Sequence, residues 1–345
     1  MRDNEGRTID YLRISVTDRC NLRCIYCMPE DGVKCLSHDQ IMTYDEIVTV
    51  CRVFAKHGLK KIKITGGEPL VRKDVVELIR ELKAIPGITN VTITTNGVLL
   101  EQYYDALVKA GIDGITVSLD TLNREVFRQI TRRDELDRVL AGIDKAIQQA
   151  ASFEMDNGDA DDSSASGTRK VKFKINCVPV FGVEKQEILA LLNYAKDTDV
   201  DVRFIEMMPI GLGKKFEFVS EDSLKALLEE YYGPLTLCEE KRGNGPSTHY
   251  NVPGLTGKVG FISAVSHKFC DKCNRVRLTS DGYLKTCLQY ENGVALKPLL
   301  QQGVSEKELW NAMETAIKSK PKAHHFEEKR DEAEDEVKGM SQIGG

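Results

Sequence analysis

The sequence predicts an α/β fold built on a largely parallel sheet. Over the first two-thirds of the 345-residue chain, six short strand-like segments alternate with helix-like segments. Runs such as KIKIT and VTITT have the two-residue alternation of strands, and glycine follows two of the apolar helical stretches. Strand–helix–strand units pair their strands in parallel through right-handed crossovers. An open doubly wound sheet and a partial barrel both fit this pattern.

The predicted elements follow one another at short intervals. The predicted strands are Tyr11–Val16, Lys61–Thr65, Val91–Thr95, Gly114–Leu119, Val171–Val178 and Asp201–Glu206. The predicted helical segments are Tyr44–His57 (before Gly58), Arg72–Lys83, Leu100–Ala110 (before Gly111), a long helical stretch that ends near Ala151, and Lys185–Lys196.

The alternation of strand-like and helix-like segments is interrupted at two places, and this pattern suggests two domains. Residues 152–169 include DNGDADDSSASG, which predicts a flexible acidic insertion. Beyond Pro209, Gly and Pro become frequent, and short strand-like stretches at 258–263 and 275–278 flank a second group of cysteines. We therefore predict one domain over 1–210 and a smaller one over 211–345. The charge run at 329–338 reads as a solvated tail.

Composition is that of an ordinary globular protein, with 41% hydrophobic and 29% charged residues. No apolar run approaches the ~20 residues of a membrane span, and the first residues lack an apolar signal core. We expect a reducing, cytoplasmic location, where the ten cysteines serve as ligands or free thiols. The net charge of −5 argues against general nucleic-acid binding.

Three cysteines occupy one short loop as Cys20-x3-Cys24-x2-Cys27, with no fourth ligand nearby. Three thiolates can hold three corners of a 4Fe–4S cube and leave one iron open. A structural zinc site normally needs a fourth Cys or His. A zinc knuckle, or three ordinary buried cysteines, is the alternative. The aromatic Tyr26 before the third cysteine favours the iron–sulfur cluster.

The spacing of a second trio, Cys270-x2-Cys273-x13-Cys287, does not identify the metal that these cysteines bind. Zinc, with Cys238, His267 or His249 as a fourth ligand, and iron–sulfur are both compatible with the spacing. Arg275 and Arg277 lie between the second and third of these cysteines, and on a strand they point to one face. Two guanidiniums there could bind a polyphosphate, whereas a solvated basic face is the alternative.

Thr65-Gly66-Gly67-Glu68-Pro69 follows the second strand. Its two glycines let the backbone approach a ligand closely, at the strand end where sites form in parallel α/β folds; a tight turn is the alternative. Thr94 and Ser118 also stand at strand ends, where helix capping is the more common role.

The first cysteine run resembles the radical S-adenosylmethionine (SAM) superfamily. With ITGGEP, TTNG, VSLD, RFIEMM, the second trio and a Gly-Gly terminus in order, the chain resembles, within that superfamily, the GTP 3',8-cyclase family of molybdenum cofactor biosynthesis. The resemblance implies a partial (β/α)6 TIM-type barrel with a smaller C-terminal cluster-binding domain. It implies a lyase in which a 5'-deoxyadenosyl radical from SAM abstracts the ribose 3' hydrogen of GTP, and C3' then bonds to C8.

The resemblance also implies roles for particular residues. Two 4Fe–4S clusters would be held by Cys20, Cys24 and Cys27 and by Cys270, Cys273 and Cys287. SAM would contact Tyr26, Gly67, Ser118 and Met208. GTP would be bound by Arg13, Lys61, Lys63, Thr94, Lys174, Arg203, Arg275 and Arg277, the last two with catalytic roles. Lys63 stands where the family often has Arg, so phosphate binding would change in geometry. The Gly344-Gly345 tail would return to the active site.

The partners implied are GTP, an electron donor whose identity the sequence does not give, a second copy in a homodimer, and the next enzyme of molybdopterin synthesis as product acceptor. No membrane or nucleic-acid partner is expected. Two rival interpretations fit parts of the sequence. A different radical SAM enzyme with auxiliary clusters would carry a cysteine-richer C-terminal region. A non-enzymatic metal protein would not need the Gly-Gly-Glu-Pro element.

Overall fold

The computed structural model describes residues 1–156, 171–182, 184–240, 242–326 and 338–344. Most of the predicted acidic insertion, nearly all of the 329–338 charge run and Gly345 therefore lie outside the described residues. No helix in the described ranges is long and apolar enough to cross a membrane.

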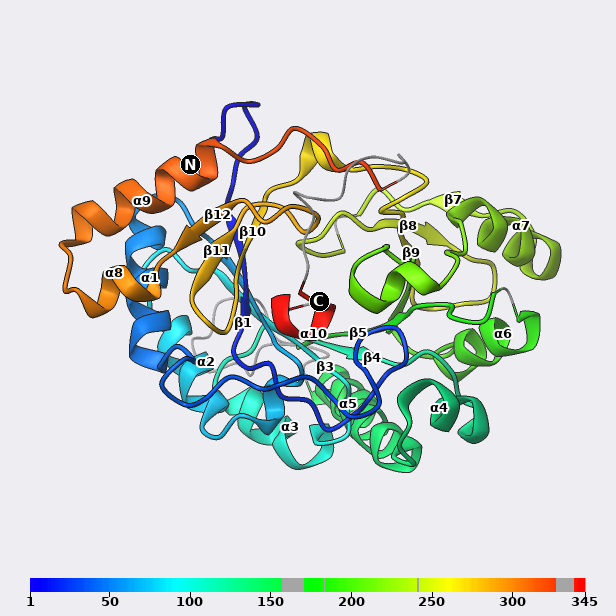
Figure 1. Ribbon diagram of the computed structural model, residues 1–345. Coiled ribbons are helices and arrows are strands. Elements are labelled where there is room, and N and C mark those ends of the chain that lie inside the picture. The colour runs from blue at the N-terminus through cyan, green and yellow to red at the C-terminus, as the bar shows by residue number, and fades with distance from the viewer. Residues whose placement is uncertain (157–170, 183, 241, 327–337, 345) are drawn as a thin grey trace.

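The described strands form a single curved sheet with the order β12-β11-β10-β1-β2-β3-β4-β5-β6-β9-β8-β7. Strands β10, β1 to β6 and β9 run parallel, and the outer strands are antiparallel. Within the described part of the chain no hydrogen bonds join the two edges, so the sheet is an open arc around a central space (Figure 1). This arrangement confirms the partial barrel. The strands are β1 (Tyr11–Ser15), β2 (Lys61–Thr65), β3 (Asn90–Thr95), β4 (Gly114–Ser118), β5 (Lys172–Cys177), β6 (Asp201–Ile205), β7 (Thr236–Leu237), β8 (Thr248–Asn251), β9 (Val259–Ile262), β10 (Arg275–Leu278), β11 (Tyr283–Lys285) and β12 (Gly293–Ala295).

Most helices lie on the outer side of the arc, whereas the short C-terminal helix α10 lies inside it (Figure 1). The helices are α1 (Tyr44–Lys56), α2 (Val75–Lys83), α3 (Leu100–Lys109), α4 (Arg124–Thr131), α5 (Leu136–Asp156), α6 (Lys185–Tyr194), α7 (Glu221–Tyr232), α8 (Lys297–Gln301), α9 (Glu306–Lys318) and α10 (Met340–Ile343), with 3-10 turns η1 (Pro69–Val71), η2 (Gly211–Lys215) and η3 (Cys270–Lys272).

The long helical stretch predicted to end near Ala151 is helical but is divided between Thr131 and Leu136 into α4 and α5. Arg132 adopts a left-handed conformation with φ 55°, which ends α4 and which a non-glycine residue rarely adopts. The break leaves the end of α4 in contact with the first cysteine loop. The main-chain N–H groups of Arg23 and Ile25 in that loop donate to the carbonyls of Thr131 and Ile130 at 2.9 Å. The end of α4 thus supports that loop.

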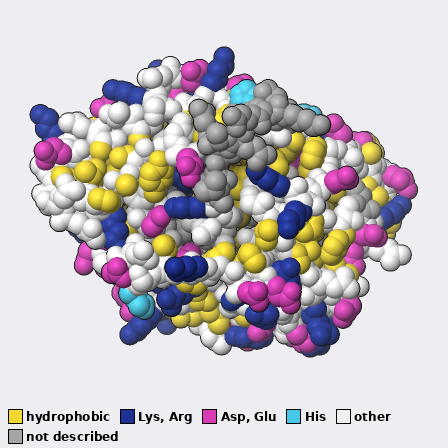
Figure 2. Space-filling view, in the orientation of Figure 1, with side chains coloured by type: hydrophobic (Ala, Val, Ile, Leu, Met, Phe, Trp, Pro, Cys, Tyr) yellow, Lys and Arg dark blue, Asp and Glu magenta, His cyan; other side chains and the backbone are white. Residues whose placement is uncertain are grey.

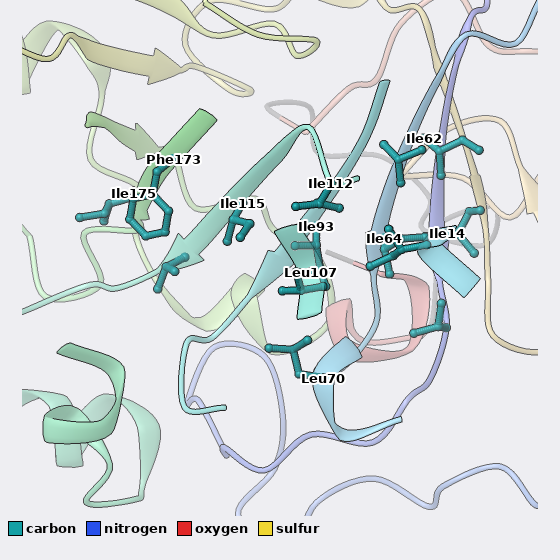
Figure 3. Close-up of a cluster of buried hydrophobic side chains, with 14 of the residues drawn as sticks. Ile14, Ile62, Ile64, Leu70, Ile93, Leu107, Ile112, Ile115, Phe173 and Ile175 are labelled. Carbon is teal, nitrogen blue, oxygen red and sulfur yellow. The ribbon is translucent and has the colours of Figure 1, made fainter. Parts of the chain in front are cut away.

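Alternation along the strands separates the core from the site. Alternate residues such as Ile14, Ile64 and Ile93 face the helices and are fully buried, and Figure 3 shows part of this aliphatic layer. Burial of each such side chain contributes roughly 1.5–3 kcal/mol. The intervening residues, among them Arg13 and Lys63, therefore face the inside of the arc.

Residues beyond 210 extend the same sheet at both edges: β9 pairs with β6, and β10 pairs with β1. The proposed domain boundary near 210 stays a prediction. The pairing does fix the position of the second cysteine group beside β1. Cys270 and Cys273 immediately precede β10, which runs parallel to β1, and Cys287 follows β11, the antiparallel partner of β10.

Candidate active site

One cavity of about 630 Å³ lies inside the arc, and all of the predicted site residues border it. The residues brought together are Arg13, Cys20, Cys24, Tyr26, Cys27, Lys61, Lys63, Gly67, Thr94, Ser118, Lys174, Arg203, Met208, Cys270, Cys273, Arg275, Arg277 and Cys287.

The two cysteine trios lie at opposite ends of the barrel. The loop with Cys20, Cys24 and Cys27 follows the C-terminal end of β1, the end at which Gly67 and Ser118 also lie. Cys270 and Cys273 instead precede β10, and the N–H groups of residues 10 and 11 at the start of β1 bond the Asn274 carbonyl at 3.2 Å. The cavity therefore runs from one trio to the other.

The Gly-Gly-Glu-Pro segment packs directly on the first cysteine loop. The Gly67 N–H bonds the Thr17 carbonyl at 2.6 Å, and the Glu68 N–H bonds the Arg19 carbonyl at 2.8 Å. A Cβ on Gly67 would lie 2.4 Å from the Arg19 carbonyl oxygen, so no other residue fits without moving the backbone. The tight-turn alternative does not account for this contact with the cysteine loop.

Glu68 is a buried carboxylate for which the motif's spacing suggested no role. It accepts hydrogen bonds from the Thr95 hydroxyl (2.7 Å) and from the N–H groups of Asn96 (2.6 Å) and Leu70 (3.0 Å). Burial raises the pKa of Glu68 to about 7, against these hydrogen bonds, which favour the ionised form. Its carboxylate fixes the end of β3 against the end of β2.

Asp120, the last residue of the VSLD run, is a second buried carboxylate that fixes neighbouring segments, here Tyr26 and the residue after β5. The Tyr26 hydroxyl donates to its carboxylate at 2.8 Å, and the Val178 N–H donates at 2.8 Å. Burial raises the pKa of Asp120 to about 6. Sequence reasoning did not assign Asp120 a role, although it follows Ser118 by only two residues. The bond to Asp120 orients the tyrosine beside Cys24 and Cys27.

Burial dominates the electrostatics of the first trio and raises the pKa of the Cys20 thiol to about 11 and of the Cys27 thiol to about 12. In the second trio the balance differs. Burial opposes ionisation of Cys273, but the charges of Lys320 and Arg275 outweigh it and lower the pKa of that thiol to about 7. Cationic side chains therefore favour the thiolate at Cys273, whereas burial raises the pKa of Cys270.

The surroundings of the cysteines decide between the open metal alternatives. Among the described residues, no three Cys, His, Asp or Glu side chains converge on a point as one metal ion requires. The suggested fourth zinc ligands, Cys238, His249 and His267, do not border the cavity that the second trio borders. Three cavity-facing thiols without a fourth ligand fit an iron–sulfur cube with one open iron.

Between the two trios the cavity wall is cationic. Arg277, Arg13 and Lys63 are register partners on the adjacent parallel strands β10, β1 and β2. The Lys63 ammonium donates to the hydroxyls of Thr94 (3.1 Å) and Thr116 (3.4 Å). The Arg203 guanidinium donates to the same Thr116 hydroxyl at 3.3 Å. Three neighbouring strands thus place positive charges side by side, and Arg203 adds another from β6.

These charges stand in a buried site that disfavours them. Burial, together with the charges of Arg203 and Arg13, holds the pKa of Lys63 well below its usual value. Burial and the charge of Arg13 likewise lower the pKa of Arg277. Lys and Arg far outnumber the acidic residues in the described lining. Because buried like charges repel, the cavity is suited to a polyanion. The solvated-face alternative fails for Arg277, which is buried.

Two of the predicted GTP ligands form ion pairs with acids. The Lys61 ammonium lies 2.8 Å from the Asp10 carboxylate. The Lys174 ammonium lies 2.6 Å from Asp201, which also accepts from the Arg242 guanidinium at 2.7 Å. Burial and the charge of Arg203 lower the pKa of Lys174 to about 8 despite this pair. Asp201 therefore keeps Lys174 protonated near neutral pH.

Asp201→Asn is expected to weaken GTP binding. Without the carboxylate, the pKa of Lys174 falls further below about 8, so the cation is lost as pH rises through this lower value. We expect the KM for GTP to rise roughly tenfold at pH 8, equivalent to about 1.4 kcal/mol, and to recover towards pH 6. Asp199→Asn is the matched control, because Asp199 pairs with Arg242 at 2.8 Å but is half exposed. An unchanged KM in Asp201→Asn would contradict this role.

The C-terminal helix α10 lies inside the arc of strands (Figure 1). Met340 and Ser341 border the cavity, and the Ser341 N–H bonds the Cys27 sulfur. At the other side, the Arg277 guanidinium donates to the Gly344 carbonyl at 2.5 Å. The described part of the tail thus connects the first cysteine loop with a guanidinium beside the second trio.

Comparison with known proteins agrees with this geometry. Residues 14–151 match the Radical SAM superfamily, and residues 200–326 match Molybdenum Cofactor Synthesis C. A Clostridium perfringens (strain 13 / Type A) protein named GTP 3',8-cyclase is 40% identical over 345 residues, with 100% of both chains covered. A Petrotoga mobilis protein of the same name is 42% identical over 352 residues, again with 100% of both chains covered.

The chain belongs to the GTP 3',8-cyclase family. Membership extends over the whole chain, so it includes both cysteine trios and the cationic wall between them. The crystal structure of Streptococcus suis SuiB bound to S-adenosylmethionine resembles this family member with a TM-score of 0.56 and 17% identity, over 90% of this chain and 68% of that one. At that identity the likeness concerns the fold alone, and it agrees with the partial barrel.

Proposed function

We propose that the protein is a radical SAM GTP 3',8-cyclase that joins C3' of the ribose to C8 of guanine as the first step of molybdenum cofactor biosynthesis. Its cofactors are two 4Fe–4S clusters and SAM. One observation carries the proposal: a single cavity has a cysteine trio at each end and buried cationic side chains between them. A purely structural metal protein would have no use for those charges.

The proposed roles follow from position. Cys20, Cys24 and Cys27 hold the first cluster, and Tyr26, Gly67, Ser118 and Met208 bind SAM at the same end of the barrel. Cys270, Cys273 and Cys287 hold the second cluster at the far end. The triphosphate lies against the charges that face inward from the strands, which are Arg13, Lys61, Lys63, Lys174, Arg203, Arg275 and Arg277, with Thr94 beside Lys63.

When bound, the first cluster and SAM supply a 5'-deoxyadenosyl radical. The protein's part is to hold the ribose of GTP in reach of it, because a near-attack separation of ~3–3.5 Å carries much of the rate enhancement. Arg13 and Lys63 fix the phosphates from adjacent strands. The buried wall and the inserted tail exclude water, which protects a reactive radical from side reactions. Arg277 links the nucleotide wall to the tail.

The proposal is tested by following one hydrogen atom. Protein reconstituted anaerobically with iron and sulfide is given reductant, SAM and GTP deuterated at C3', and the 5'-deoxyadenosine is weighed by mass spectrometry. We expect deuterium in that product and a cyclised nucleotide. Unlabelled 5'-deoxyadenosine would mean that another substrate is attacked, as in a different radical SAM enzyme. Deuterium added at C2' serves as the positional control.

The reaction starts with one electron, so we propose an electron donor, and the product requires an enzyme that consumes it. We also propose a homodimer, which sedimentation of the cluster-loaded protein would test.

A further inference from the structure

One buried arginine outside the cationic wall has a different kind of environment. Arg7 lies in the N-terminal segment before β1, and its side chain is 5% exposed. Its Nε donates to Asp3 at 2.6 Å. The four remaining N–H groups of its guanidinium have main-chain carbonyl acceptors, namely Cys270 (3.1 Å) and Lys322 (2.8 Å) for Nη1, and Lys320 (3.3 Å) and Pro321 (2.8 Å) for Nη2.

All five donors of this guanidinium are therefore used, and none is left to bind a phosphate. This separates Arg7 from Arg13 and Arg277, although all three border the cavity. Asp3 is fully buried and balances the charge; its other oxygen accepts from the Arg7 N–H at 2.9 Å. A buried, fully bonded ion pair adds little net stability but specifies one geometry.

The geometry that it specifies is that of the second cysteine trio. Arg7 holds the main chain at Cys270 directly. It also holds the segment 320–322, from which the Lys320 ammonium donates to the carbonyl of Arg275 at 3.1 Å and to that of Thr286. Arg275 is two residues after Cys273, and Thr286 immediately precedes Cys287. Each of the three cysteines therefore lies within two residues of a main-chain carbonyl that accepts a hydrogen bond from Arg7 or Lys320.

We propose that Arg7 is a positioning residue for the second cluster. Resting on the proposed function, the inference assigns to the Asp3–Arg7 pair the task of holding three separate chain segments so that Cys270, Cys273 and Cys287 can share one cube. These segments are far apart in the sequence, and an ammonium in place of the guanidinium could satisfy at most three of the five acceptors. The first trio, at the other end of the barrel, makes no bond to Arg7 among the described contacts.

The test is Arg7→Lys, which keeps the charge and removes the planar fork. After reconstitution we expect about half of the iron to be lost, with the Mössbauer signal of one 4Fe–4S cluster remaining. SAM cleavage to 5'-deoxyadenosine should persist, uncoupled from GTP, while cyclised product disappears. Arg2→Lys is the matched control, because Arg2 is an exposed cation in the same segment, and it should keep both clusters.

Asp3→Asn is a milder second variant, since it leaves the four carbonyl bonds in place and should lose second-cluster iron only partly. Full iron with normal cyclisation in Arg7→Lys would overturn the proposal. Loss of both clusters in parallel with a fall in Tm, in both variants, would also overturn it, because it would make the pair a general folding element. The iron result needs no GTP, so it is independent of whether wild-type protein transfers deuterium from C3'.

Discussion

Cys24→Ala and Cys273→Ala are expected to divide the activity into two parts. Loss of Cys24 removes a ligand of the proposed first cluster, so SAM cleavage and cyclisation should both fall to background. Loss of Cys273 should leave SAM cleavage measurable, because the first trio lies at the opposite end of the barrel. Cyclisation should still fall by at least about 10²-fold, since a misplaced reacting group costs about that much.

The measurement compares 5'-deoxyadenosine with cyclised nucleotide in one reaction mixture. Cys35→Ala is the control for handling and oxidation, since Cys35 is exposed and lies outside the cavity. Equal loss of both products in Cys273→Ala would show that the two trios are not separable, contrary to the roles proposed here. Retained cyclisation in Cys24→Ala would contradict the proposal that a radical formed from SAM at the first cluster starts the reaction.

Much of the fold was predictable because it depends on local periodicity. The strands β1 to β6 agree with the predicted ranges to within two residues, since alternating segments between helices are recognisable one at a time. The break between α4 and α5 was not, because a left-handed Arg132 leaves no mark in the sequence. The outer strands β7, β11 and β12 are two or three residues long, too short to show a period.

The site, like the fold, has residues that short sequence motifs predict and residues that they do not. Its cysteines and glycines stand in short motifs, so their place in the cavity could be predicted, and the family, fold and cofactors predicted from them are confirmed. Arg7, Asp201 and Asp120 were missed. Each acts through contacts with residues distant in the sequence, as when Arg7 meets Cys270, 263 positions away. Such roles become visible only when the folded chain brings the segments together.

Surface charge also illustrates the limit of composition. The net charge of −5 says nothing of where the charges lie. Lys and Arg side chains are scattered among Asp and Glu over the face shown in Figure 2, whereas Lys and Arg outnumber Asp and Glu in the cavity wall. A chain that is acidic overall therefore offers a polyanion a locally basic site.

Gly344→Ala is expected to lower cyclisation by about 10- to 100-fold while SAM cleavage continues. Gly344 has a φ of 74°, and a Cβ there would lie 2.7 Å from the Thr65 hydroxyl and 2.9 Å from the Ser15 Cβ. Both neighbours are buried on adjacent strands, so the tail must move. Its carbonyl would then leave the Arg277 guanidinium, and a charge beside the nucleotide would lose its orientation.

The control separates this clash from the cost of the backbone conformation. Gly303 has a similar φ of 68°, but a Cβ there would meet nothing within 4 Å. Gly303→Ala should therefore lower the free energy of unfolding by about 1–2 kcal/mol, the cost of the left-handed conformation, and leave cyclisation normal. Gly344→Ala should show the reverse, with cyclisation lowered and Tm nearly unchanged, because the tail moves and the buried strands that it contacts stay in place. Wild-type cyclisation in Gly344→Ala would mean that the tail's position inside the barrel has no part in the reaction.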